Sequence, residues 1–223
     1  MIRIDLHTHS TGSPDGSISL EDYRKLLNDR TLDYIAITDH NTIEEALIIQ
    51  KQLGDRIIVG EEIMTRDGEI IGLYLSTKIT PGMSAQETVT AIKNQGGMVY
   101  IPHPFETVRK GISKETLDTI AGSVDIIEVH NGRAVFQNKG PQAVTWSRVN
   151  SVVGAASSDA HGVSGMASTS TTIAEKPTKK TLVSLLEKAR FTAKRPPLLS
   201  LLYPKLNRLR DRKSTRLNSS HDS

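Results

Sequence analysis

The chain has 223 residues, 37% of them hydrophobic, which is enough to bury the core of one domain or a small barrel. It contains no cysteine, which excludes disulfide bonds and thiolate ligands and leaves nitrogen and oxygen as the only metal donors. The net charge of +3 hides an asymmetry, because residues 1–175 hold 15 Lys and Arg against 22 Asp and Glu, whereas residues 176–223 hold 13 against 3.

Strand-like and helix-like segments alternate from the first residues onward. Predicted strands are residues 2–6, 33–40, 56–60, 69–75, 98–104, 124–131, 151–157 and 169–174, the fourth of them antiparallel to the third. Predicted helices begin at residue 19 and span residues 42–53, 84–96, 113–122, 141–149 and 178–190, with capping-box patterns at Ser19, Thr42 and Ser84. This alternation is typical of parallel strands joined by crossover helices. It predicts an α/β fold with a closed or nearly closed barrel in a single domain.

Histidines mark the carboxyl ends of these strands. His7 and His9 point the same way, about 7 Å apart, because alternate residues of a strand share a face. Such a pair alone is equally consistent with two hydrogen-bonded histidines. However, six of the seven histidines follow predicted strands, with carboxylates beside them: His7, His9, His40, His103, His130 and His161, with Asp15, Glu62 and Asp159. In a parallel barrel these ends meet on one rim, which predicts two or three bound metal ions.

Seven short motifs then point to a family. The segments DLHTHS, SPDGS, TDHN, GEE, IPHP, EVHN and SDAH occur in this order within residues 1–175, and the sequence resembles the PHP family (polymerase and histidinol phosphatase domain). The resemblance implies a distorted (β/α)7 TIM-like barrel with a trinuclear metal centre on its rim. It implies one ion held by His7, His9, Glu62 and Asp159; a second held by Glu62, His103 and His130; and a third held by Asp15, His40 and His161.

Two positions in this assignment have neighbours that compete with them. Glu62 is chosen over Glu61 because the family motif is Gly-x-Glu, counted from Gly60. The position of His130 varies among similar relatives, so that Glu128 or Asn131 is the alternative group facing the metals. Relatives that act on nucleoside bisphosphates and short RNAs carry an inserted helical domain, but only 40 residues separate Glu62 from His103. We therefore expect a more open site here.

The resemblance and the donor set predict an enzyme. We expect hydrolysis of a phosphate monoester on a small phosphorylated metabolite, by a hydroxide that bridges two divalent cations. Zinc, manganese and iron all accept these ligands. No protein nucleophile is required, and Arg133 and Arg109 are the candidate phosphate-binding residues.

Three alternatives stay open at this point. The first is a nuclease or phosphodiesterase acting on nucleic-acid ends, although the chain has only three Phe, one Trp and five Tyr for base stacking. The second is a non-catalytic domain that metal ions stabilise. The third is an amidohydrolase-like hydrolase, which is often associated with a carboxylated lysine, and no lysine lies at a predicted strand end within these motifs.

The chain divides into three predicted parts. Residues 1–190 form the barrel, residues 191–210 are a basic and apolar extension that packs on it, and residues 211–223 form a disordered tail. That tail resembles translated sequencing-adapter sequence and does not look native. No apolar run approaches the ~18 residues of a membrane span and no leader-like stretch precedes the first strand, so we expect a cytoplasmic protein.

Overall fold

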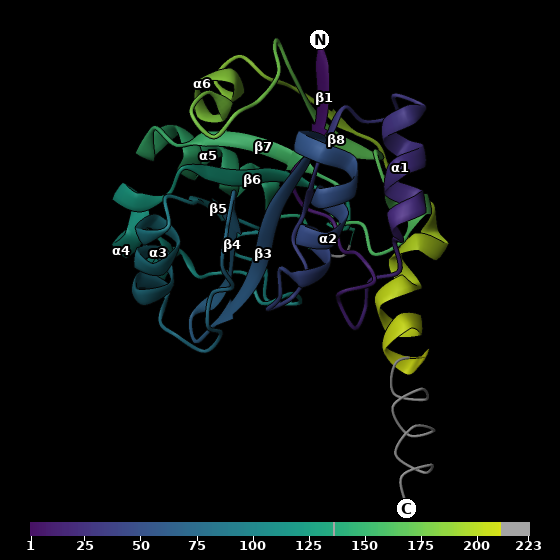
Figure 1. Ribbon diagram of the computed structural model, residues 1–223. Helices are drawn as coiled ribbons and strands as arrows, with labels where there is room; N and C mark the ends of the chain where they lie inside the picture. Colours follow the sequence, from purple (N-terminus) through teal and green to yellow (C-terminus); the bar gives the residue numbers. More distant parts are fainter. Residues whose placement is uncertain (136, 211–223) are drawn as a thin grey trace, which may run out of the picture.

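The computed structural model describes residues 1–135 and 137–210 (Figure 1); the predicted tail, 211–223, lies outside the described residues. The described strands form one nine-stranded sheet in the order β7-β6-β5-β4-β3-β2-β1-β8-β9. The strands are β1 (Ile2–Asp5), β2 (Tyr34–Ile37), β3 (Ile57–Thr65), β4 (Gly68–Leu73), β5 (Met98–Ile101), β6 (Ile126–Asn131), β7 (Val153–Ser157), β8 (Thr169–Ile173) and β9 (Arg190–Ala193). The α-helices are α1 (Leu20–Asn28), α2 (Glu44–Leu53), α3 (Ala85–Asn94), α4 (Lys114–Ile120), α5 (Gly140–Asn150) and α6 (Leu182–Leu186).

The sheet curls into a nearly closed barrel. Strands β1, β2 and β3 pair in parallel, as do β5, β6 and β7, while β4 runs antiparallel between the two sets. The two sides approach each other where the Thr171 hydroxyl of β8 accepts from the Ala156 N–H at 2.8 Å and contacts the Ala156 carbonyl at 2.9 Å. Beyond the strand ends, a parallel bridge joins Thr8 to Ala160. The predicted α/β barrel is confirmed, including the antiparallel fourth strand.

Apolar side chains fill both faces of the strands. In β2, Ile35 and Ile37 belong to the core beneath the helices, whereas Tyr34 and Ala36 belong to a second cluster with residues of β1, β3, β5 and β7. The second cluster fills the barrel and includes Leu182 of α6, which lies at the same end of the molecule as the N-terminus (Figure 1). Burial on both faces explains why these strands are almost continuously apolar.

Two of the three predicted capping boxes form. The side chains of Ser19 and Ser84 each accept a hydrogen bond from the backbone N–H three residues later. In return, the acidic side chain at that later position accepts from the backbone N–H of the serine. The prediction for Thr42 is wrong, because α2 begins one residue later, with Ile43 at its N-cap. The Thr42 hydroxyl instead accepts from the Glu44 N–H at 3.3 Å, a local turn that competes with a cap.

The C-terminal part adds a strand and a helix to the barrel. Strand β9 pairs antiparallel with β8, so the predicted boundary at residue 190 falls inside an element of the sheet. Residues 203–210 are helical, and Figure 1 shows this segment, in yellow, beyond the end of α1, beside the loop that follows β1. Among the described residues, no helix combines the length and apolarity needed to cross a bilayer.

Candidate metal centre and active site

Eight of the nine predicted ligands converge at one end of the barrel. They lie in the loops after β1, β2, β5 and β7, or on β3. Together with Glu69, they form four groups in which the donor atoms lie within 4.8 Å of one another: His9, Asp15, His40 and His161; His7, Glu62 and His103; His7, His9 and Asp159; and His40, Glu62 and Glu69. The groups share His7, His9, His40 and Glu62, so they form one continuous cluster.

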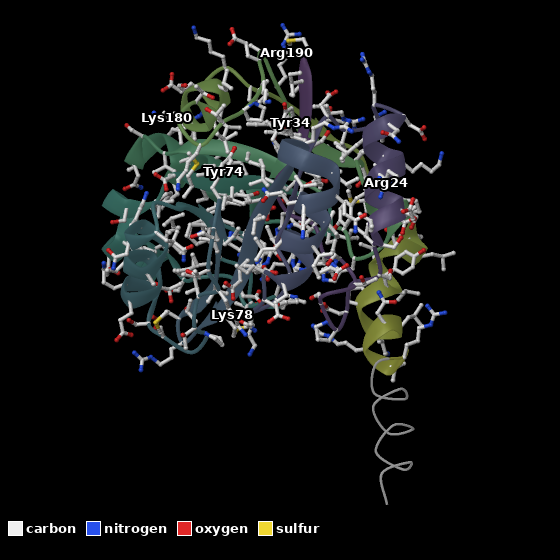
Figure 2. The ribbon with its side chains drawn as sticks, viewed as in Figure 1. Arg24, Tyr34, Tyr74, Lys78, Lys180 and Arg190 are labelled. Carbon is white, nitrogen blue, oxygen red and sulfur yellow. The ribbon has the colours of Figure 1, made fainter. Side chains whose placement is uncertain are left out.

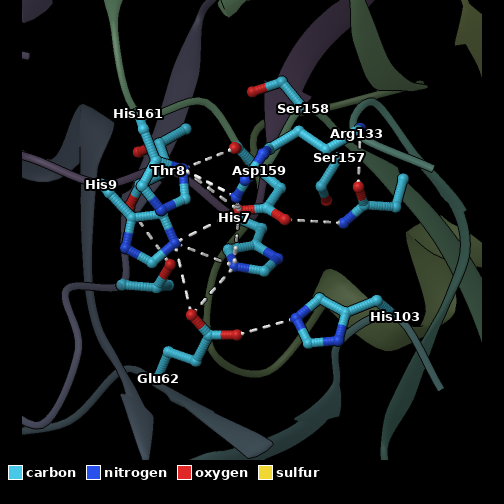
Figure 3. Close-up of polar contacts among 12 residues, drawn as sticks. His7, Thr8, His9, Glu62, His103, Arg133, Ser157, Ser158, Asp159 and His161 are labelled. Carbon is cyan, nitrogen blue, oxygen red and sulfur yellow. Dashed lines mark hydrogen bonds and ion pairs between the residues drawn. The ribbon is translucent and has the colours of Figure 1, made fainter. Parts of the chain in front are cut away.

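Glu62 lies at the centre of this cluster and uses its two oxygens differently. Oε1 lies 3.0 Å from Nε2 of His103. Oε2 lies 3.4, 3.3 and 3.1 Å from ring nitrogens of His7, His9 and His40. Figure 3 shows the carboxylate between His103 on one side and the His7–His9 pair on the other. This is the position of a carboxylate that can bridge two cations.

His7 and His9 aim their Nε2 atoms at the same point. The two atoms are 3.2 Å apart, and Asp159 Oδ1 lies 3.5 Å from the first and 3.4 Å from the second. Two imidazole lone pairs converge there with oxygens of Asp159 and Glu62 in a fully buried place (Figure 3). A cation between these atoms would satisfy all of them at once.

Asp15 contacts two further histidines of the cluster. Its Oδ2 lies 3.6 Å from Nε2 of His40 and 3.6 Å from Nε2 of His161. The His161 ring stacks on His9 with centroids 4.0 Å apart, which joins Asp15 and His161 to the other members of the cluster. The loop that carries Asp15 therefore delivers a carboxylate to two histidines from different strands.

The electrostatics of the cluster call for positive charge. Burial lowers the pKa of His9 to about 3, and His161 and His40 add to the effect. Burial also disfavours protonated His7, but Asp159, Glu62 and Glu128 outweigh it and raise the His7 pKa well above its ordinary value. Burial disfavours the charged form of Glu62, yet the neighbouring histidines hold its pKa well below the usual range. The buried carboxylates of the cluster therefore stabilise positive charge that is placed among them.

The sequence analysis does not predict one acidic residue of the cluster, Glu69. Its carboxylate lies 3.8 Å from His40 and 3.7 Å from His103. Burial, and then the Glu62 carboxylate, raise its pKa to about 7. Glu69 is at the start of β4, and the antiparallel β3–β4 hairpin places it opposite Met64, on the same face as Glu62. The Asp67-Gly68 hairpin signal, combined with cross-strand counting, would have found it.

The prediction that His130 is a metal ligand is wrong. Its side chain is exposed, and its ring packs edge-on against Phe191 with centroids 5.7 Å apart. The register of β6 on β7 shifts between Glu128 and His130, so the usual alternation of faces is interrupted by a bulge. The alternative, Glu128, faces the cluster instead.

Glu128 contacts the ring of His7 and the backbone of His103. Its Oε1 lies 3.3 Å from Nδ1 of His7 and accepts from the Tyr100 hydroxyl at 3.0 Å. Its Oε2 accepts from the His103 N–H at 2.7 Å and from the Asn131 amide at 2.7 Å. A carboxylate on the second ring nitrogen fixes the tautomer and orientation of a metal-binding histidine.

The choice between Glu61 and Glu62 is settled by the strand. Successive residues of β3 point to opposite faces, and Glu61 points away from the cluster, where its Oε2 accepts from the Ile79 N–H at 2.7 Å. Glu62 is therefore the member of the pair whose side chain faces the other candidate ligands.

The two predicted phosphate-binding arginines differ. Arg109 donates to both oxygens of Glu106 at 2.7 Å, to Asp159 Oδ2 at 2.6 Å and to Asn131 Oδ1 at 2.7 Å. These contacts correct the prediction that Arg109 binds phosphate, because its donors already hold Asp159 in place. Arg133 contacts the cluster more loosely, with Nη1 3.3 Å from His161 Nδ1 and 3.6 Å from Asp159 Oδ1.

Two of the candidate ligands adopt unusual backbone conformations. His103 has φ 26° and Asp159 has φ 51°, both in the left-handed region. Such conformations cost on the order of 1–3 kcal/mol each for residues other than glycine and often mark functional sites. Hydrogen bonds hold both backbones: Asp159 N–H donates to the His7 carbonyl at 2.9 Å, and His103 N–H donates to Glu128.

The cluster opens into a cavity of about 350 Å³. Its wall combines acidic and histidine ligands with four basic residues: Asp15, His40, Glu62, Glu69, His103, Asp159 and His161, with Arg109, Lys110, Arg133 and Arg208. Nitrogen and oxygen donors and basic side chains therefore share the wall of one cavity. The donor set fits divalent transition-metal ions, which accept imidazole and carboxylate ligands.

Comparison with known proteins agrees with this geometry. The family model for the PHP domain matches residues 5–151. An uncharacterized protein of Methanocaldococcus jannaschii, MJ1587, is 33% identical over 150 residues, which cover 61% of this chain and 88% of that protein.

Solved structures share the fold. A two-domain protein of Bacteroides vulgatus, containing a predicted PHP-like metal-dependent phosphoesterase, has a TM-score of 0.71 at 19% identity and covers 86% of this chain. The chain spans 65% of the length of that protein. PsfC from Pseudomonas syringae has a TM-score of 0.65 at 14% identity, covering 96% of this chain and 99% of that one. With the family model matching most of the chain, and its motifs gathered into one cluster, this protein belongs to the PHP domain family.

Proposed function

We propose that the protein is a metal-dependent phosphatase that hydrolyses a phosphate monoester of a small molecule. The observation that carries the proposal is the placement of Glu62, whose two oxygens face separate groups of histidines in the wall of a cavity that basic side chains also line. Two or three ions suit the four donor groups. Glu62 would hold metal together with the histidines on either side of it, and Glu69 replaces His130 among the candidate ligands.

The ions and the protein have distinct tasks in this proposal. Bound zinc, manganese or iron would polarise the phosphoryl oxygens and lower the pKa of water in the cavity. Glu128 orients His7 and the backbone of His103, and Arg109 orients Asp159. Asp159 is 2% exposed, so these supports act where solvent does not compete. No protein nucleophile is needed.

The test is a screen of purified, metal-loaded protein on phosphorylated metabolites and p-nitrophenyl phosphate. We expect hydrolysis of monoesters that is lost with a chelator and restored by metal. Short single-stranded oligonucleotides form the comparison arm. Figure 2 shows Arg24, Lys78, Lys180 and Arg190 at separate places on the molecule. Preferential cleavage of oligonucleotides would contradict the proposal.

Arg133 is the other candidate phosphate-binding residue. Its guanidinium faces the cavity beside His161 and Asp159, so it can donate to a phosphoryl oxygen. We expect Arg133→Ala to raise KM about 10-fold or more and to leave metal content unchanged, as uniform binding energy is lost. Steady-state kinetics with elemental analysis measures both. A variant that loses metal at unchanged KM would show instead that Arg133 only stabilises the ligands.

A further inference from the structure

The C-terminal segment, residues 198–210, reaches the rim of the metal cluster. Asn207 is buried, and its amide donates to the backbone carbonyl of Asp15 at 2.8 Å and to that of His161 at 3.3 Å. Tyr203 packs on Gly162, where a Cβ atom would come within 2.8 Å of its ring. The segment is thus fixed to the two loops that carry Asp15 and His161.

Arg208 extends from this segment to the cavity. Its Nη2 lies 2.5 Å from Asp15 Oδ2, the oxygen that faces His40 and His161, and both Arg208 and Pro204 line the cavity. The Arg208 side chain is 60% exposed, whereas that of Asp15 is 2% exposed, so much of the Arg208 side chain stays open to solvent. Because Asn207 already anchors the segment, Arg208 is not needed to hold it in place.

Arg133 and Arg208 flank the same imidazole. Arg133 Nη1 lies 3.3 Å from Nδ1 of His161, while Arg208 holds the Asp15 oxygen that lies 3.6 Å from Nε2 of that ring. The two guanidinium groups come from opposite directions in the sequence, one after β6 and one from the C-terminal helix. Within the described residues, 1–135 and 137–210, Asp15 is the one ion-pair partner of Arg208. Arginine has five N–H donors, so further donors remain for an anion.

We propose that Arg208 is a substrate-binding residue, which donates hydrogen bonds to phosphoryl oxygens of the ester held in the cavity. The inference rests on the proposed phosphatase function and adds that the C-terminal segment completes the phosphate site. Arginine suits this task because its planar fork matches two phosphoryl oxygens at once. Lysine would keep the charge beside Asp15 but not the fork.

The experiment compares Arg208→Gln, Arg208→Lys and Lys205→Gln in the metal-loaded protein of 223 residues. Lys205 is exposed on the same helix and does not line the cavity, so it controls for loss of one positive charge. Two quantities are measured: KM and kcat for p-nitrophenyl phosphate, and the Kd of inorganic phosphate by calorimetry. Metal content and melting temperature are recorded for each variant.

We expect Arg208→Gln to weaken phosphate binding and raise KM about 10-fold, with metal content unchanged and kcat within about twofold. Arg208→Lys should recover only part of the loss, and Lys205→Gln should match the wild type. Equal Kd and KM in Arg208→Gln and Lys205→Gln would overturn the inference, as would loss of metal with unchanged phosphate affinity.

The phosphate measurement separates this inference from the proposed function. If the wild type hydrolyses esters and Arg208→Gln binds phosphate normally, the role of Arg208 is wrong and the phosphatase function stands. If the wild type binds phosphate through Arg208 but hydrolyses no ester, the site is correct and the phosphatase function is wrong. A wild type that neither binds phosphate nor hydrolyses esters contradicts both.

Discussion

Glu62→Gln is expected to lower phosphatase activity on the order of 10³-fold or more and to remove at least one metal ion per chain. The carboxylate is 1% exposed, and its oxygens contact His103 on one side and His7, His9 and His40 on the other. An amide supplies one oxygen and no charge, so it cannot serve both groups. Steady-state kinetics and elemental analysis of the purified variant measure the two effects.

Glu61→Gln is the matched control. Glu61 is the adjacent residue on the same strand, is equally buried, and faces away from the cluster. Glutamine retains an acceptor for the Ile79 N–H, so activity and metal content should stay close to those of the wild type. Full activity in Glu62→Gln together with inactivity in Glu61→Gln would show that the assignment is wrong by one residue.

The second large effect is the loss of stability when metal is removed. Ions bound to the folded state stabilise it by mass action, about 4 kcal/mol for each ion at 1,000 times its Kd. At roughly 2–4 °C per kcal/mol for a chain of this size, removing two ions should lower the melting temperature by about 15–30 °C. Thermal unfolding with and without a chelator, followed by metal addition, measures the change.

His130→Ala controls for this measurement. Its ring packs on Phe191 and lies outside the donor groups. We expect the variant to show the same chelator-induced shift as the wild type. If the melting temperature of His130→Ala no longer changes with chelator, His130 is a metal ligand after all. If the wild type melts at the same temperature without metal, the ions do not stabilise the fold.

The sequence predicts what depends on local periodicity. A strand fixes the direction of side chains two residues apart, which is why Glu62, not Glu61, faces the cluster. His7 and His9 lie just beyond β1, on either side of Thr8, which is joined to Ala160 by an isolated parallel bridge. Placement at the carboxyl ends of parallel strands is also local information, and it brings residues such as His103 and His161 to the same rim.

The errors arise where the local rule is broken. At His130 a bulge in β6 interrupts the alternation, and a bulge leaves little trace in one sequence. At Glu69 an antiparallel strand brings its amino end, not its carboxyl end, to the rim. At Arg109 the position near the site is as expected, but the choice between substrate and protein acceptors depends on the loop conformations around Glu106 and Asp159.

Arg208 and Asn207 belong to a different class of residue. Their contacts with Asp15 join positions 193 and 192 residues apart, and no periodic pattern in the chain connects them. The basic and apolar composition of the segment predicts that it packs on the body, but not that it reaches the cluster. Such residues are found only when the fold places segments that are far apart in the sequence side by side.

The most direct test of a multinuclear metal centre is the number of ions bound per chain. The protein of 223 residues should be purified without chelator, from cells supplied with zinc, manganese and iron, and analysed for metal and protein together. We expect two or three transition-metal ions per chain in the wild type. Less than one ion per chain would contradict the metal centre and the hydrolytic function built on it.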